Sequence, residues 1–148
     1  MVASRAIQAG ETILRESPLL AAPHEEMDAR IFMLLPGKAL EAVLLLHNAQ
    51  PGFNQYSSGS DIPYHRLLDN MMCTLNTNAF RGDASYGPVG LLLLTGSLFN
   101  TDNAVNVVRT WDEHLMQQVF VAARNVAQGE KLTTQYTIDP EFLRAYGI

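Results

Sequence analysis

The first part of the chain, over residues 2–20, contains two short runs with apolar residues, one centred on Ile7 and one over residues 12–14. Short runs of this kind, bounded by turn residues, are typical of strands. The tripeptide Ala9–Glu11 separates them, and Gly10 can take a positive φ at no steric cost. The pattern therefore predicts a hairpin that turns at Gly10. Pro18 has no amide hydrogen and should end the second strand.

The spacing of apolar residues becomes helical further along, in a segment of about residues 24–80. A short helix is predicted over 25–35 and a longer one over 37–48, which Pro51-Gly52 should end. The longer helix places four residues on one face: Leu40, Val43, Leu44 and His47.

A further helix is predicted after Asp61, a suitable N-cap residue, with Pro63 in its first turn. Its apolar residues recur at helical intervals. They are Leu67, Leu68, Met71, Met72 and Leu75. This helix should fray over residues 76–80.

Short strands return after this helical insert. Residues 89–95 form an apolar run that predicts a buried strand, preceded by a turn-rich loop over 82–88. The other predicted elements are a hairpin of strands 105–111 and 118–124 around the turn 112–116, a strand over 131–136 and a closing helix over 140–146. The predicted fold is mostly β with a helical insert (α+β), in a single domain over residues 1–148.

Two segments far apart in the sequence resemble each other. SRAIQAGETIL (residues 4–14) and ARNVAQGEKLT (residues 123–133) share the pattern Arg-x-[Ile/Val]-x-x-Gly-Glu-x-[Ile/Leu]. They are too short and too widely separated for a solenoid repeat. The pattern predicts two similar hairpins, each with a glycine turn.

Composition narrows the class of protein. The chain has 148 residues, 47% of them hydrophobic and 17% charged, which is typical of a globular domain. The net charge of −5 offers no basic surface for nucleic acid, and a basic peptide is an easier partner. No apolar run is long enough to span a bilayer. The first residues lack the layout of a signal peptide, so we expect an intracellular protein of the nucleus or cytoplasm.

Metal and thiol chemistry receive little support from the sequence. Cys73 is the only cysteine, so neither a disulfide within the chain nor a cysteine-based zinc site is expected. The histidines show no ligand spacing, and we expect no metal. Cys73 lies within a helical apolar stripe, where a structural thiol is favoured over a nucleophile. The acids and histidine over 112–114 fall in a predicted turn, which favours solvated side chains over an acid–base pair.

Asparagines carry the most suggestive chemistry. They flank two apolar segments, and their amides offer donors and acceptors together, which suits a purine edge or an amino-acid zwitterion. Ordinary loop chemistry is the alternative, since asparagine favours turns. These residues are Asn76, Asn78, Asn100, Asn103 and Asn106. Tyr136 ends a predicted strand and is, by default, a core or rim tyrosine with a satisfied hydroxyl.

Four stretches, taken in order, resemble a SET-domain protein lysine methyltransferase of the SET-and-MYND-like type common in fungi. ASRAIQAGETILRESPLL resembles the opening hairpin of that family. LPGKALEAVLLLHNA with Thr77–Phe80 resembles its helical insert and the return to the sheet. SLFNTDNAVN stands where the family has SxFNHSCxPN, and VFVAARNVAQGEKLTTQY resembles the closing run up to the tyrosine.

The resemblance implies a SET-like β-clip fold of small sheets, in which the C-terminal segment threads under a loop as a pseudoknot. It also implies methyl transfer from S-adenosylmethionine to a lysine of a histone or other protein. Tyr136 would be the catalytic tyrosine that orients the lysine amine. The implied cofactor-binding residues are Asn78, Ser97, Asn100 and Thr101, and the implied pseudoknot residues are Asn106, Gly129 and Glu130.

Some positions depart from the family pattern. Thr101 replaces its histidine, Asp102-Asn103 replaces Ser-Cys, and Val105 replaces a proline. A Gly-x-Gly motif would precede Met1, and a cysteine-rich zinc segment would follow Ile148. No MYND zinc finger is present. We therefore expect part of the cofactor pocket and one wall of the lysine channel to be missing, as in a natural short form, a truncated form or a degenerate member.

Three functions remain open from the sequence. The first is an active lysine methyltransferase that uses S-adenosylmethionine. The second is a non-catalytic SET-like module that binds a peptide or protein, consistent with the altered motif SLFNTDNAVN. The third is a sensor that retains cofactor binding without methyl transfer.

Overall fold

The structure is a computed structural model, which describes residues 1–48, 64–102 and 104–136. It is mostly β, with antiparallel sheets and two α-helices in the described ranges, as the sequence predicts for the fold class. The chain divides into two compact units. One comprises Met1–Pro18 and Thr95–Ile148, and the other comprises Leu19–Leu94.

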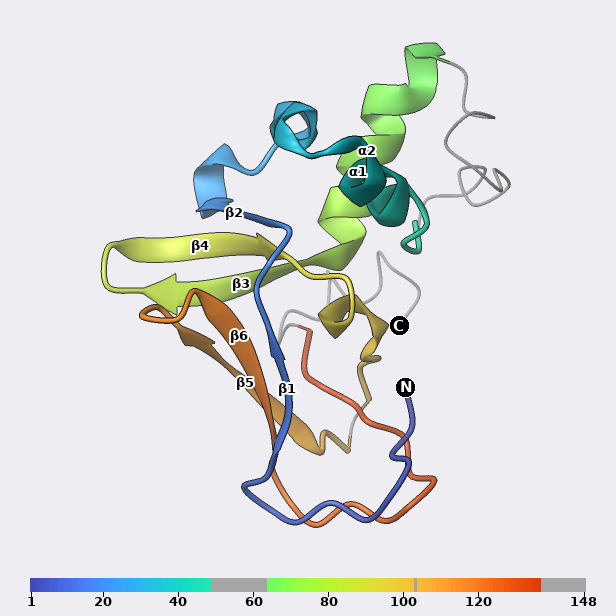
Figure 1. Cartoon of the computed structure of the whole chain (residues 1–148), viewed down its shortest axis with the longest axis vertical. Coiled ribbons are helices and arrows are strands. Elements are labelled where there is room, and N and C mark those ends of the chain that lie inside the picture. Colours follow the sequence, from blue (N-terminus) through green and yellow to red (C-terminus); the bar gives the residue numbers. More distant parts are fainter. Residues whose placement is uncertain (49–63, 103, 137–148) are drawn as a thin grey trace. The chain divides into compact units, whose positions relative to one another are not determined.

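The first unit contains a three-stranded antiparallel sheet in the order β1-β6-β5 (Figure 1). Its strands are β1 (Thr12–Glu16), β5 (Val107–Asp112) and β6 (Gln117–Ala122). The predicted hairpin of strands β5 and β6 is confirmed, with its turn between Asp112 and Gln117. Strand β1 ends before Pro18, as expected.

The predicted hairpin over residues 2–20 is wrong. Gly10 does form a turn at φ +82°, but the segments on either side of it pair elsewhere. Strand β1 pairs with β6, and Ile7 forms an antiparallel bridge with Val126. The turn at Gly10 is therefore confirmed, but the pairing partners lie more than 100 residues away in the sequence. The Ile7 amide, for example, donates to Val126 O at 2.9 Å.

The two similar segments, 4–14 and 123–133, are not separate hairpins either. They lie side by side and pair with each other, with Val2 bridged to Lys131 and Ile7 to Val126. The amide of Gly129 donates to Ala3 O at 2.8 Å, and that of Gly10 donates to Ala122 O at 2.8 Å. Gly10 and Gly129 share the same φ of 82°. The repeated pattern therefore makes two matching turns of one paired structure.

The second unit contains another antiparallel sheet, in the order β2-β4-β3. Its strands are β2 (Leu20–Pro23), β3 (Ala79–Ala84) and β4 (Gly87–Leu92). The loop predicted over 82–88 is wrong, because most of it belongs to the β3–β4 hairpin. Gly87, at φ +123°, permits a tight turn there, and the turn-forming residues had suggested a longer loop.

Helices pack beside this second sheet. They are α1 (Gly37–Leu44) and α2 (Tyr64–Asn78), with 3-10 turns η1 (His24–Glu26) and η2 (Ala29–Leu34) in place of the short helix predicted over 25–35. Helix α2 does not fray after residue 76; it runs to Asn78 and continues directly into β3. The core contains Leu20, Phe32, Val43, Met71, Leu75 and Leu92.

The predicted apolar stripe of α2 is confirmed except at Leu68, which is 56% exposed. The helix predicted over 37–48 ends earlier, at Leu44, and does not include His47. Residues 51–52, 61, 63 and 140–146, on which other helix boundaries and the closing helix are predicted, lie outside the described ranges. In the part of the chain that the structure describes, no helix is long and apolar enough to cross a membrane. The same part contains no group of three or more His, Cys, Asp or Glu side chains that could hold a metal ion.

Candidate functional site

The asparagine-containing loop of the first unit begins with the 3-10 turn η4 (Gly96–Leu98). Ser97 in this turn is partly buried. The next residue but one, Phe99, is fully buried, and its ring stacks on that of Phe120 with a centroid distance of 4.7 Å. This stacking fixes the middle of the loop to strand β6.

Tyr136 reaches the same loop from the C-terminal segment. Its hydroxyl donates a hydrogen bond of 2.5 Å to the carbonyl oxygen of Phe99. The Arg109 guanidinium lies 3.5 Å from the carbonyl oxygen of Tyr136. Burial raises the pKa of the Tyr136 hydroxyl, which therefore stays protonated at neutral pH. This contact brings the predicted catalytic residue and the predicted cofactor loop together.

Asn100 and Thr101 follow Phe99 directly. The Asn100 side chain is exposed, while its carbonyl oxygen accepts a 2.9 Å hydrogen bond from the Thr134 amide. Thr101 is partly buried. Asn100 also forms a parallel bridge with Thr133. The backbone at Asn100 is therefore held, and its amide side chain is left facing solvent.

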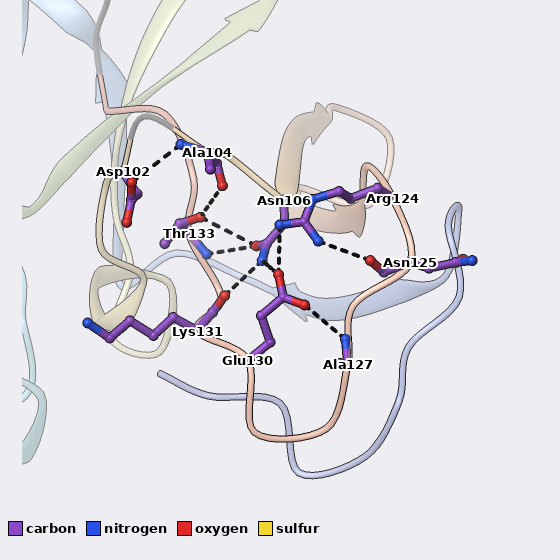
Figure 2. A network of polar contacts seen from close by, with 9 residues as sticks. All are labelled: Asp102, Ala104, Asn106, Arg124, Asn125, Ala127, Glu130, Lys131 and Thr133. Atoms are coloured by element: carbon purple, nitrogen blue, oxygen red, sulfur yellow. Dashed lines mark hydrogen bonds and ion pairs between the residues drawn. The ribbon is translucent and has the colours of Figure 1, made fainter.

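Asn106 closes the loop and is the centre of the polar network in Figure 2. It is 1% exposed. Its Nδ2 donates to Lys131 O at 2.7 Å and to Glu130 Oε1 at 3.1 Å. Its Oδ1 accepts from the Thr133 amide at 2.9 Å. One buried side chain thus binds three residues of the segment that leads to Tyr136, and a fourth, longer contact of 3.5 Å joins its Oδ1 to Thr133 Oγ1.

The segment that leads to Tyr136 contacts other parts of the chain on both sides. Lys131 forms a bridge with Val2, and Thr134 forms a parallel bridge with Val107. The regular strand predicted over 131–136 is therefore replaced by isolated bridges. These contacts put the segment beside the loop as a pseudoknot requires, and threading under the loop stays a prediction.

Glu130 supports this network from a turn that contains Gly129 at φ +82°. Its carboxylate contacts Arg124 Nη2 at 2.7 Å and accepts from the Ala127 amide at 2.9 Å. The Arg124 hydrogen bond, followed by those of Ala127 and Asn106, lowers the pKa of Glu130 from 4.5 to about 2. The carboxylate is therefore ionised throughout the neutral range.

The lowered pKa of Glu130 predicts an acid-dependent contribution to stability. A carboxyl with a depressed pKa in the folded state contributes fully above its unfolded pKa, near 4.5, and loses that contribution as the pH falls toward about 2. We expect the free energy of unfolding of the native chain to fall more steeply between these values than that of Glu130→Gln. Urea titrations at successive pH values measure both slopes, and equal slopes would contradict the prediction.

Asn78, the remaining predicted cofactor residue, belongs to the second unit. It ends helix α2, where it is 7% exposed. Its Nδ2 donates to His47 O at 2.7 Å and to Thr74 O at 2.8 Å. Both amide hydrogens of Asn78 therefore hold the end of the helix in this unit. Its convergence with Asn100 and Tyr136 stays a prediction.

Other residues of the site were missed from the sequence. Phe99 supplies both the ring that packs on β6 and the carbonyl that accepts from Tyr136, and Thr133 is the main partner of Asn106. The apolar residue inside the polar stretch SLFNTDNAVN was the available signal for Phe99. No sequence signal distinguishes Thr133, because threonine is common in strands.

Cys73, on α2, is partly buried. Burial, followed by the charge of Asp69, raises the pKa of its thiol. A thiol with a raised pKa is a poor nucleophile at neutral pH, which supports the structural interpretation. Asp112 caps the β5–β6 turn by accepting from the Leu115 amide at 3.1 Å, and His114 is exposed.

The residues of this site lie within a region that matches the model of a known protein family. The sequence profile of the SET domain matches residues 1–137. The chain belongs to the SET-domain family. Members of this family are generally protein lysine methyltransferases that bind S-adenosylmethionine and act on lysine-containing proteins such as histones. A search of curated proteins gave no match. The SET-domain match includes both the Ser97–Asn106 loop and Tyr136.

Proposed function

We propose that this SET-domain protein is a protein-lysine N-methyltransferase that uses S-adenosylmethionine. The observation that carries the proposal is the hydrogen bond from the Tyr136 hydroxyl to Phe99 O, at 2.5 Å. It joins the predicted catalytic residue to the loop that contains Ser97, Asn100 and Thr101. A reacting group bound at this loop would lie close to the Tyr136 hydroxyl.

The donors and acceptors of the loop fit the cofactor. S-adenosylmethionine supplies a methyl group already activated by its sulfonium, together with an adenine edge and an amino-acid zwitterion. The exposed Asn100 amide offers both a donor and an acceptor to such groups. Ser97 and Thr101 add hydroxyls on either side of Asn100 in the sequence, and Asn78 stays among the proposed cofactor-binding residues.

The Tyr136 hydroxyl has a defined hydrogen-bonding capacity. A phenol has one hydrogen to donate and two lone pairs, and here the hydrogen goes to Phe99 O. The lone pairs can accept from a lysine amine and so orient it for in-line attack. Because burial raises its pKa, Tyr136 is not a base at neutral pH. Its role in this proposal is therefore to position the amine.

The proposed substrate is a lysine-containing protein or peptide, either a histone or another protein. The net charge of −5 favours association with a basic segment over nucleic acid. We further propose that the reaction takes place inside the cell, in the nucleus or the cytoplasm, in keeping with a single cysteine in the chain.

A second function is favoured by a specific observation. Thr101 and Asp102 stand where the family motif has other residues after Asn100. Asp102 makes a hydrogen bond within the loop, because its Oδ1 accepts from the Ala104 amide at 3.3 Å. A loop altered in this way suits a SET-like module that binds a peptide or protein without methyl transfer. A sensor that binds the cofactor without turnover is the intermediate case.

Calorimetry with S-adenosylmethionine, followed by a methyl-transfer assay on histone peptides, separates these functions. The proposal expects binding by the native chain that is weakened in Asn100→Ala, whose backbone contact to Thr134 remains. Gln128→Ala, which removes an exposed amide side chain elsewhere in the same unit, is the control. Absence of binding at millimolar cofactor would reject the proposal for this chain. Binding without transfer would favour the sensor.

A further inference from the structure

We propose that Glu16 is a positioning residue that fixes the start of the candidate cofactor loop. Glu16 is the last residue of β1, far from the loop in sequence. Its Oε1 accepts from the Thr95 amide at 2.9 Å, and its Oε2 accepts from the Gly96 amide at 2.7 Å. The inference deepens the proposed function and rests on it, since the loop is taken to hold S-adenosylmethionine.

The contact is specific for a carboxylate. Each oxygen receives one of two successive backbone amides, and an ionised acceptor makes such bonds shorter and stronger than a neutral one. A glutamine in this place would present one oxygen and one NH2 group, so one of the amides of Thr95 and Gly96 would face another donor. Gly96 is buried, which makes the loss of its partner costly.

Strand pairing sets the direction of this side chain. Glu16 lies opposite Gln118 on β6, and Gln118 and Phe120 are two residues apart, so all three side chains lie on one face of the sheet. Phe120 on that face stacks on Phe99 of the loop. The sheet therefore holds the loop at its start through Glu16 and in its middle through Phe99.

A third contact holds the loop just beyond Phe99, where the Thr134 amide donates to Asn100 O at 2.9 Å. Ser97 lies between the first and second of these contacts, and Asn100 lies at the third. A loop ordered before binding loses less conformational entropy when a ligand binds. The carboxylate of Glu16 is therefore expected to affect the affinity for the cofactor more than the rate of methyl transfer.

The experiment compares the native chain with Glu16→Gln and Glu16→Ala by two measurements. Hydrogen exchange by NMR follows the amides of Thr95 and Gly96, and calorimetry measures the Kd for S-adenosylmethionine. We expect exchange of both amides to become about tenfold faster or more, and the Kd to rise about tenfold, because hydrogen bonds to a charged group are lost.

Two controls separate positioning from general stability. Glu11→Gln changes another glutamate just before β1 that pairs with Arg5 at the surface. Gly90→Ala lowers stability in the second unit, since its added Cβ would lie 2.3 Å from Met27 Cγ. Both controls should leave the Kd within about twofold of the native value, because neither removes a contact of Glu16 with the loop.

The outcomes distinguish the anchoring of the loop, the positioning role of Glu16 and the proposed function. Unchanged exchange at Thr95 and Gly96 in Glu16→Gln would overturn the anchoring by Glu16. Faster exchange with an unchanged Kd would overturn the positioning role, as would an equal rise of the Kd in Gly90→Ala. If the native chain binds no S-adenosylmethionine, the proposed function and the positioning role fail together, and faster exchange would still establish Glu16 as the anchor of the loop.

Discussion

Replacing Asn106 with alanine is expected to lower the free energy of unfolding by about 3 kcal/mol, because the buried Thr133 amide and two partly buried acceptors lose a hydrogen-bond partner at once. The side chain is 1% exposed and binds Lys131 O, Glu130 Oε1 and the Thr133 amide. Each buried group left without a partner costs about 1–3 kcal/mol. Urea denaturation followed by circular dichroism measures the change.

Gln128→Ala is the control for this prediction. Gln128 is an exposed residue in the turn before Glu130, so its replacement should change the free energy of unfolding by less than about 0.5 kcal/mol. A loss of under about 1 kcal/mol in Asn106→Ala would contradict a central role for this network.

The effect of placing a negative charge at position 106 can be tested with a side chain of nearly the same shape. Asn106→Asp keeps an acceptor for the Thr133 amide but sets a second carboxylate beside that of Glu130, where the native amide lies at 3.1 Å. Adding Glu130→Gln supplies a donor to the new carboxylate. The double variant should therefore be more stable than Asn106→Asp alone, and additive losses would contradict direct coupling of the two side chains.

Replacing Tyr136 with phenylalanine is expected to lower kcat for methyl transfer by about 100-fold, because the hydroxyl that positions the lysine amine in this proposal is lost. The ring remains, so packing is largely kept. The lost hydrogen bond to Phe99 O, 2.5 Å long in the native chain, should cost about 1 kcal/mol of stability. Radiometric transfer assays and calorimetry with S-adenosylmethionine separate the rate from the affinity.

The matched control is Tyr86→Phe. Tyr86 is 63% exposed in the turn between β3 and β4, so this change removes a hydroxyl without touching the loop. It should leave both kcat and the Kd within about twofold. A Tyr136→Phe variant that transfers methyl groups at the native rate would exclude a catalytic role for the hydroxyl, whereas a raised Kd with unchanged kcat would assign Tyr136 to holding the loop.

Local signals in the sequence predicted much of the secondary structure. The strand predicted over 118–124 corresponds to β6, and the helical spacing of Met71 and Leu75 predicts the buried face of α2. Gly10 and Gly129 are predicted as turn residues, and both have positive φ. These successes share a cause, since periodicity and glycine chemistry depend on neighbours in the sequence.

Pairing between distant segments could not be obtained in this way. The segments around Gly10 and Gly129 each resembled a hairpin, yet they pair with each other, because a strand pattern fixes which face is buried and leaves the partner open. The β3–β4 hairpin was missed because its turn residues resemble a longer loop. Phe99 illustrates the same limit, since only the folded chain shows that it stacks on Phe120.

The pattern of residues along the chain predicts the mostly β fold class, and its ordered motifs predict the SET-domain family, which the match over residues 1–137 confirms. The same motifs also mark Asn106 and Tyr136 as residues of interest. What these residues contact depends on the folded chain. Asn106 binds the segment before Tyr136, the Tyr136 hydroxyl meets Phe99 O, and Glu16 holds Thr95 and Gly96. Such contacts join residues far apart in the chain, and only folding brings their donors and acceptors within hydrogen-bonding distance.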